Sequence, residues 1–179
     1  MKKALVVIDI QREYVTPGRS FHIHGIGPSL ENAFSMLQFA RSSGWPIVHV
    51  QHIQDGDLFG RDSAGADFID GFVPKNSETL AVKGNYSSFS SPEFERFANE
   101  HKDCELVVIG YGTTMCCLST IVDGYHRGYR FALVEDACAA KATPSHTEAS
   151  MHSHAVAILQ PFARLTQTEA EMATAPALA

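Results

Sequence analysis

Apolar residues are spaced along this chain in two ways. Short apolar runs are typical of buried parallel strands, and they lie at residues 4–10, 46–50, 79–82, 106–109, 131–134 and 162–165. Between them, apolar residues recur every three or four positions, which predicts amphipathic helices that begin near Ser29, Ser91, Met115 and Ser145. Strand and helix therefore alternate. This alternation predicts an α/β protein with three layers, in which a mostly parallel sheet of about six strands lies between two layers of helices.

Cap and turn residues set the limits of these elements. Ser91 with Pro92 predicts a helix start, and Ser145 with Glu148 has the spacing of a capping box. Residues 54–77 are polar, glycine-rich and irregular, which is typical of a loop that covers a site. The 179 residues are expected to form one domain over 1–179, whose tail from about residue 167 is loose or packs on a neighbour.

Composition narrows the class of protein. The net charge is -6 and no stripe of lysine or arginine occurs, so nucleic acid is not expected as a partner. No apolar segment approaches the ~18 residues of a membrane span, and the first apolar run is too short for a signal peptide. The four cysteines have neither a zinc-site nor a CxxC spacing, which favours reduced thiols. We therefore expect a cytoplasmic protein without membrane contact.

Three chemically reactive side chains follow different predicted strands. Asp9 ends the first, Lys83 ends the third, and Cys116 comes just after the fourth. Ligands of open parallel sheets bind outside the carboxyl ends of the strands. The sequence therefore predicts that these three residues meet at one edge of the sheet. Each also has an ordinary structural interpretation, as a helix cap, a solvated lysine and a buried thiol respectively.

Cysteine, carboxylate and lysine together can hydrolyse an unreactive carbonyl compound. Cys116 follows the turn Gly110–Gly112 at the predicted start of a helix, where the unpaired N–H groups and the helix dipole favour a thiolate. Asp9 would accept the thiol proton, and Lys83 would hold the resulting charge. Backbone N–H groups of the turn would stabilise the oxyanion of a tetrahedral intermediate.

Four segments resemble the isochorismatase-like cysteine hydrolases over nearly the whole chain, from about Ala4 to Thr166. Val6–Gln11 is similar to the apolar strand of that family that ends in Asp-x-Gln. Lys83–Phe89 resembles its K-x-x-Y-S-x-F motif, and Gly110–Thr120 resembles its G-x-x-T-x-x-C-x-x-x-T motif. Val134–Ala137 resembles the strand that follows. The motifs occur in the family's order and at matching separations.

The resemblance implies a Rossmann-type fold and a role for each candidate. Asp9 would be the general base, Lys83 its charged partner and Cys116 the nucleophile, with Cys117 in core packing. It also implies a cis peptide bond between Tyr111 and Gly112, which would aim the N–H groups of Gly112 and Cys116 at the oxyanion. Members of the family usually assemble as dimers or larger homo-oligomers, and a small molecule is the expected substrate.

Departures from the family pattern narrow the reaction. Members that act on nicotinamide carry an Asp-x-His metal motif after the second strand, where this chain has Gln51, His52 and Ile53. We therefore expect no metal and no cofactor. Members that cleave isochorismate lack the cysteine, which is present here. The remaining reaction is hydrolysis of a C–N bond in a small amide, carbamoyl or ureido compound, through a thioester on Cys116.

Aromatic residues are the expected substrate contacts. The motifs indicate Tyr86, Phe89 and Tyr111, while Tyr14 and Gln11 follow the Asp9 strand closely enough to reach the same site. His52, at the end of the second strand, is either a further site residue or a structural histidine.

Two other functions stay open at this point. The adjacent Cys116 and Cys117 suit a thiol redox protein or sensor, and the fold suits a binding protein without catalytic activity.

Overall fold

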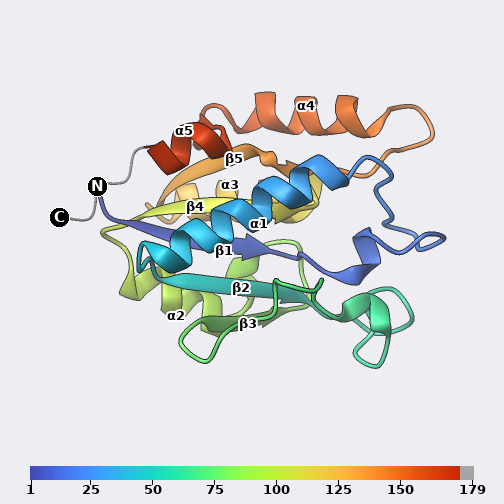
Figure 1. Cartoon of the computed structure of the whole chain (residues 1–179), viewed down its shortest axis with the longest axis horizontal. Coiled ribbons are helices and arrows are strands. Elements are labelled where there is room, and N and C mark those ends of the chain that lie inside the picture. Colours follow the sequence, from blue (N-terminus) through green and yellow to red (C-terminus); the bar gives the residue numbers. More distant parts are fainter. Residues whose placement is uncertain (174–179) are drawn as a thin grey trace.

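A six-stranded sheet forms the centre of the computed structural model, which describes residues 1–173 (Figure 1). The strands follow the order β3-β2-β1-β4-β5-β6, and every neighbouring pair is parallel. Their bounds are Lys3–Ile8 (β1), Ile47–His52 (β2), Thr79–Lys83 (β3), Glu105–Tyr111 (β4), Arg130–Ala139 (β5) and Arg164–Thr166 (β6). The predicted parallel sheet is confirmed.

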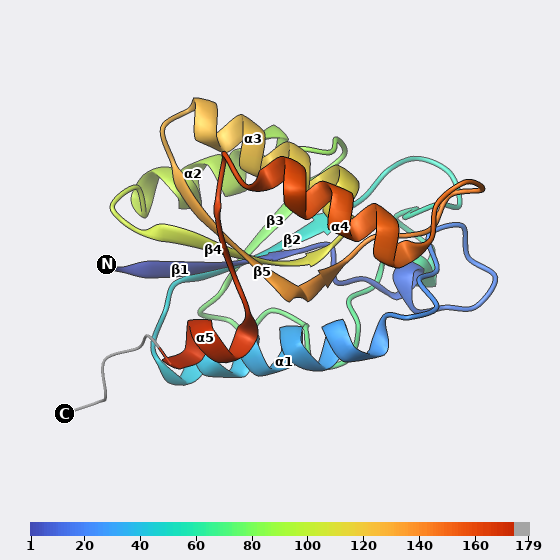
Figure 2. The ribbon, with the colours of Figure 1, turned by 90° about the horizontal axis from the view of Figure 1, so that it is seen from above.

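Helices cover both faces of this sheet (Figure 2). One layer contains α1 and α5, and the other contains α2, α3 and α4. The helices are Gly27–Ser42 (α1), Pro92–Glu100 (α2), Leu118–His126 (α3), Glu148–Leu159 (α4) and Thr168–Ala173 (α5). Shorter helical turns lie at Arg12–Tyr14, Ala64–Ala66, Ser88–Ser90 and Thr113–Cys117. This is the three-layer α/β/α arrangement that the alternating pattern predicts. None of the helices within residues 1–173 has the length and apolar content needed to cross a bilayer.

The central strand β1 shows why its sequence is apolar without interruption. Val6 and Ile8 pack in the core beneath α2, α3 and α4, whereas Leu5 and Val7 pack in the core beneath α1. All four side chains are completely buried. Each contributes roughly 1.5–3 kcal/mol through burial, so both faces of the strand favour this central position.

The strand order creates a crevice at one edge of the sheet. From β1 the chain moves outward to β2 and β3, and it then returns to the other side of β1 as β4. The connections after β1 and β4 therefore diverge, and ligands of doubly wound sheets bind at such a point. Asp9 follows β1 and Cys116 follows β4, so the fold brings both to this crevice.

The first part of the tail, which the sequence predicts to be loose or to pack on a neighbour, is helical in this structure. Thr168–Ala173 forms α5, which packs against α1 and β5. Glu171 of α5 is completely buried and pairs with Arg164 and Lys3. The Lys3–Glu171 pair joins residues far apart in the chain, which is why the composition of the segment does not reveal it. Residues 174–179, the rest of the predicted tail, lie outside the described residues.

The start of α4 also differs from the predicted capping box. The Thr147 hydroxyl caps the helix by accepting from the Ser150 N–H. Glu148 instead accepts hydrogen bonds from the backbone N–H groups of His24 and Gly25, at 2.7 and 2.9 Å. Glu148 therefore ties α4 to the loop before α1, whereas the capping-box motif predicts that it binds within its own helix.

Candidate active site

The side chains of Asp9, Lys83 and Cys116 meet in the structure. The Lys83 ammonium lies within hydrogen-bond distance of the other two. Lys83 Nζ is 2.9 Å from Asp9 Oδ2 and 3.3 Å from Cys116 Sγ. Lys83 extends from the end of β3 past β2 to reach Asp9, and all three residues are buried. The convergence that the strand-end argument predicts is therefore present.

Asp9 has an unusual backbone conformation and an incomplete set of partners. Its φ is +51°, in the left-handed region that aspartate tolerates better than most residues. The N–H of Asp9 donates to the Val50 carbonyl, and its own carbonyl accepts from the Gln11 N–H, which together hold the turn. Lys83 binds Oδ2, but the buried Oδ1 has no partner. Asp9 therefore has one oxygen fixed by an ammonium group and one that can accept a proton.

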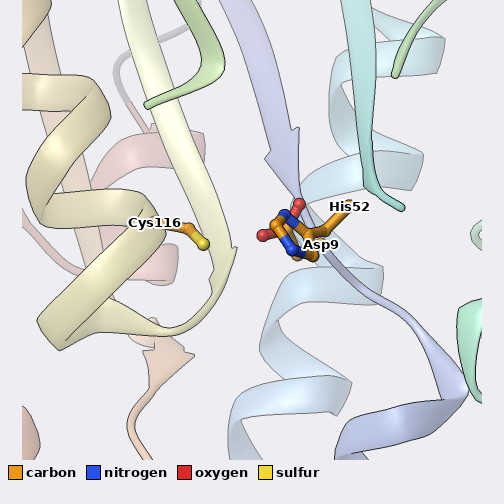
Figure 3. A group of neighbouring side chains, drawn as sticks. All are labelled: Asp9, His52 and Cys116. Carbon is orange, nitrogen blue, oxygen red and sulfur yellow. The ribbon is translucent and has the colours of Figure 1, made fainter. Parts of the chain in front are cut away.

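Two glycines shape the connection that carries Cys116. Gly110 has a φ of +127°, and a Cβ there would lie 2.0 Å from the Ile8 carbonyl oxygen. Gly112 has a φ of +73°, and a Cβ there would lie 3.2 Å from Tyr14 Oη. Only glycine therefore permits this close passage. The π-helical turn Thr113–Cys117 follows and directs Cys116 toward Asp9 and His52 (Figure 3). Such turns occur frequently at functional sites.

The predicted cis peptide bond between Tyr111 and Gly112 is absent. No peptide bond within residues 1–173 is cis. The left-handed conformation of Gly112 makes the turn instead. A non-proline cis bond costs roughly 3 kcal/mol, whereas glycine adopts a positive φ with little cost, so the trans turn is the less demanding solution.

The resting form of Cys116 is the neutral thiol, which corrects the expectation of a thiolate at a helix N-terminus. Burial raises the pKa of Cys116 well above its usual range, and the negative charge of Asp9 raises it further. Lys83 opposes both effects without overcoming them. In addition, α3 begins only at Leu118, so Cys116 precedes the regular helix. Ionisation of this thiol therefore requires that its proton move to a nearby base.

His52 completes the group of side chains around the Lys83 ammonium. His52 Nδ1 lies 3.1 Å from Lys83 Nζ, and Nε2 lies 3.1 Å from Gln54 Oε1. Burial and the charge of Lys83 lower the pKa of His52, so the ring is neutral at pH 7. The hydrogen-bond network then assigns Nδ1 as the acceptor from Lys83 and Nε2 as the donor to Gln54.

The same group has donor atoms that suit a metal ion. Asp9, His52 and Cys116 each offer one ligand atom, and these atoms lie within 4.8 Å of one another. Lys83 Nζ already contacts all three residues, so a bound cation would compete with this ammonium for every ligand. The absence of a metal stays a prediction.

Comparison with known proteins assigns the family. The sequence profile of the Isochorismatase domain matches residues 3–170. This chain belongs to the isochorismatase family. It is 34% identical over 142 residues to the uncharacterized isochorismatase family protein YddQ of Bacillus subtilis, covering 78% of each chain.

A second relative and a solved structure agree with this assignment. The chain is 24% identical to the maleamate amidohydrolase of Pseudomonas putida, over 81% of this chain and 76% of that protein. The crystal structure of an isochorismatase from Pseudomonas putida KT2440 superimposes with a TM-score of 0.86 at 28% identity, covering 93% of this chain and 88% of that one.

A cavity of about 190 Å³ opens beside Cys116 in this isochorismatase-family protein. Tyr14 and Tyr86, both predicted as substrate contacts, line it together with His52. Five further lining residues were missed by the sequence argument, and they are Phe21, Gln54, Leu58, Phe59 and Met115. Four of the five lie in loops without hydrophobic periodicity, so no pattern marked them. Phe59 has a φ of +49°, which is rare for a bulky residue and therefore points to a constrained position.

The other three predicted contacts serve the protein's own packing and do not line this cavity. Gln11 binds backbone atoms of His52 and Ala66, which joins the β1 and β2 ends. The Phe89 ring packs against Phe94 and Tyr129 in the core. Tyr111 is completely buried, with its hydroxyl 3.4 Å from Ser29 Oγ. A motif fixes the position of a residue along the chain but not the direction of its side chain, which the packing decides.

Cys117 has different polar contacts from its neighbour Cys116. It is completely buried, and its thiol donates to the Tyr111 carbonyl at 3.6 Å. A hydrogen bond with Cys138, together with burial, raises the pKa of Cys117 well above its usual range. Both Cys116 and Cys117 are free thiols, and the contacts of Cys117 are those of core packing.

Proposed function

We propose that this isochorismatase-family protein is a cysteine amidohydrolase. It cleaves a C–N bond of a small amide, carbamoyl or ureido compound through a thioester on Cys116. The observation that supports this most directly is the contact of Lys83 Nζ with both Asp9 Oδ2 and Cys116 Sγ, while Asp9 Oδ1 remains unpartnered. An unpartnered buried oxygen is costly to desolvate, and in Asp9 it leaves one position that can accept a proton.

The first half-reaction forms the thioester. Asp9 Oδ1 accepts the thiol proton as the sulfur attacks the carbonyl carbon, so that a C–S bond forms and the carbonyl oxygen becomes an oxyanion. The backbone N–H groups of Gly112 and Cys116 are the proposed donors to this oxyanion. The intermediate then collapses, the C–N bond breaks, and the proton on Asp9 passes to the leaving nitrogen.

The second half-reaction releases the acid. Asp9 accepts a proton from a water molecule that attacks the thioester carbonyl, and the C–S bond then breaks as the thiol recovers its proton. Throughout both steps Lys83 stays within reach of the carboxylate and the sulfur. Burial lowers the pKa of Lys83, but Asp9 and Cys116 together raise it above its ordinary value, so the ammonium is retained. A fixed positive charge lowers the cost of the developing thiolate.

The amidohydrolase relative supports the choice of bond. The protein from Pseudomonas putida is named for the hydrolysis of maleamate, which contains an amide C–N bond. Maleamate also contains a carboxylate, but we take only its amide C–N bond as a guide to the reaction of this protein.

Ammonia release from a panel of small amides, carbamoyl and ureido compounds tests the proposal. At least one compound should be hydrolysed, and a rapid quench should trap an acyl adduct on Cys116 that mass spectrometry maps. Cys116→Ala should abolish both signals. Cys104→Ala is the matched control, because Cys104 is equally buried but lies just before β4, at the opposite end of that strand. Hydrolysis that persists in Cys116→Ala would refute the mechanism.

A further inference from the structure

We propose that the cavity beside Cys116 selects small uncharged amides and excludes acyl groups that carry a carboxylate. This inference rests on the proposed function for the identity of the reacting bond, but the selection by charge concerns the cavity itself. The volume of about 190 Å³ is below the roughly 300–1,000 Å³ of sites for drug-sized ligands, so the substrate is small.

Three aromatic rings form one wall of the cavity. Tyr14 and Phe59 have ring centroids 5.5 Å apart, as do Phe21 and Phe59. The Tyr14 and Phe21 centroids are 6.0 Å apart, so each ring supports the other two. Leu58 and Met115 extend this apolar lining. This wall is already formed without a ligand. It would bind the acyl part of a substrate through apolar packing against the rings.

Within residues 1–173, none of the residues that line the cavity is an arginine or a lysine. Lys83 contacts the lining residues Asp9 and Cys116, and an ammonium group has three protons to donate. Asp9, His52 and Cys116 already lie at hydrogen-bond distances from its Nζ. Lys83 is therefore fully occupied by the catalytic group.

Two cations of the surrounding loops have partners outside the cavity, and a third lines a different hollow. Arg19, two positions before Phe21, binds Glu13 and Asp57. Lys141 lies over the Phe21 ring and donates to the Ser20 carbonyl. Arg61 lines a neighbouring hollow that shares Gln54 with the cavity and contains the acidic residues Asp55, Asp57 and Asp62.

A carboxylate in this cavity would therefore lose water without gaining a counter-ion. It would also approach Asp9, whose charge has the same sign. Burying an unpaired charge is strongly unfavourable, whereas an uncharged amide of the same shape avoids both penalties. The Gln54 carbonyl oxygen accepts a hydrogen bond from His52 Nε2, which leaves the Gln54 NH₂ group to donate to a neutral acceptor on the substrate.

Alkylation of Cys116 tests the selection without requiring turnover. Iodoacetamide and iodoacetate differ mainly by the charge that the cavity is proposed to reject. At pH 7.5 the ratio of the alkylation rate with iodoacetamide to the rate with iodoacetate should be at least about tenfold higher for Cys116 than for free glutathione. Mass spectrometry maps the adducts. A preference equal to or below that of glutathione overturns the inference, whether or not any amide is hydrolysed.

Hydrolysis of an isosteric pair gives the second measurement. Initial rates should give a kcat/KM for succinamide about 100-fold or more above that for succinamate. Equal values, or a preference for succinamate, overturn the inference. If neither compound nor any other amide is hydrolysed while the alkylation preference holds, the proposed function fails and the charge selection stands.

A matched pair of variants identifies the cause. Leu58→Arg adds a cation to the lining, and Leu58→Gln adds a polar group of smaller size without charge. The arginine variant should reduce the preference for iodoacetamide several-fold, and the glutamine variant should retain it. If the two variants change the preference equally, lining charge is not the cause and the inference fails.

Discussion

Two clusters of ionisable side chains in this protein each pair a histidine with a carboxylate and a cation, and they differ in how completely the carboxylate is paired. One joins His49, Glu78 and Arg41, and the other joins His52, Asp9, Lys83 and Cys116. Both use a histidine of β2, and because the two histidines are three positions apart they point to opposite faces of the strand. Each cluster contains one carboxylate and one permanent cation.

The carboxylates show the difference. Glu78 accepts two hydrogen bonds from Arg41, at 2.7 and 3.0 Å, and one from the Lys75 N–H, and it also contacts His49 Nε2 at 2.9 Å. Despite burial, these partners lower the pKa of Glu78 to about 2. Asp9 has Lys83 on one oxygen and no partner on the other. A saturated carboxylate stabilises the fold, whereas an unsaturated one beside a protonated thiol can accept its proton.

The largest effect is expected for Asp9→Asn, which should change the rate of amide hydrolysis and the reactivity of the Cys116 thiol in opposite directions. Asp9→Asn removes the base and should lower kcat/KM for amide hydrolysis about 1,000-fold or more. The same change removes the negative charge that raises the pKa of Cys116, so alkylation by iodoacetamide at pH 7 should become faster. Both rates can be measured on one preparation. Slower alkylation in Asp9→Asn would mean that Asp9 promotes ionisation even without substrate.

Removing the charge of Glu78, the fully paired carboxylate, should affect stability and leave catalysis unchanged. Glu78→Gln leaves the partly buried Arg41 guanidinium without its charge partner, which should lower the free energy of unfolding by about 3 kcal/mol. The kcat/KM of the folded variant should match that of the wild type. Urea titration measures the loss of stability. Asp70→Asn is the control, because the Arg12–Asp70 ion pair that it breaks is exposed to solvent. A large loss of activity would show that the two clusters are coupled.

Acid pH should destabilise the protein through His49. Burial lowers the pKa of His49 to about 4, below the ~6.5 of an unfolded chain. The unfolded state therefore binds the proton first, so this stabilisation is complete above pH 6.5 and is lost as pH falls toward 4. Between pH 7 and 4.5 the loss should be about 2–3 kcal/mol. Urea titrations at both pH values measure it, and His49→Gln should show a smaller decrease.

The smallest expected effect concerns the thiol next to the nucleophile. Cys117→Ala removes a weak hydrogen bond and a small buried group, and should cost about 1 kcal/mol of stability. Amide hydrolysis should stay within about threefold of the wild-type rate, because Cys117 takes no part in the proposed chemistry. If Cys117→Ala abolishes activity as Cys116→Ala does, a dithiol mechanism replaces the present one.

The sequence by itself determined the layered architecture and the three residues at the crevice. Both conclusions depend on short-range patterns: an uninterrupted apolar run marks a strand buried on both faces, and the residue after such a run must lie at the carboxyl edge of the sheet. Asp9, Lys83 and Cys116 were therefore accessible without coordinates.

Only the tertiary structure decided how these residues are paired and what surrounds them. The protonation of Cys116, the unpartnered oxygen of Asp9 and the contacts of His52 depend on which groups burial brings together. Phe21, Leu58 and Phe59 reach the cavity from loops, while Phe89 and Tyr111 turn into the core. Side-chain direction and desolvation follow from packing between segments far apart in the chain, which no local spacing encodes.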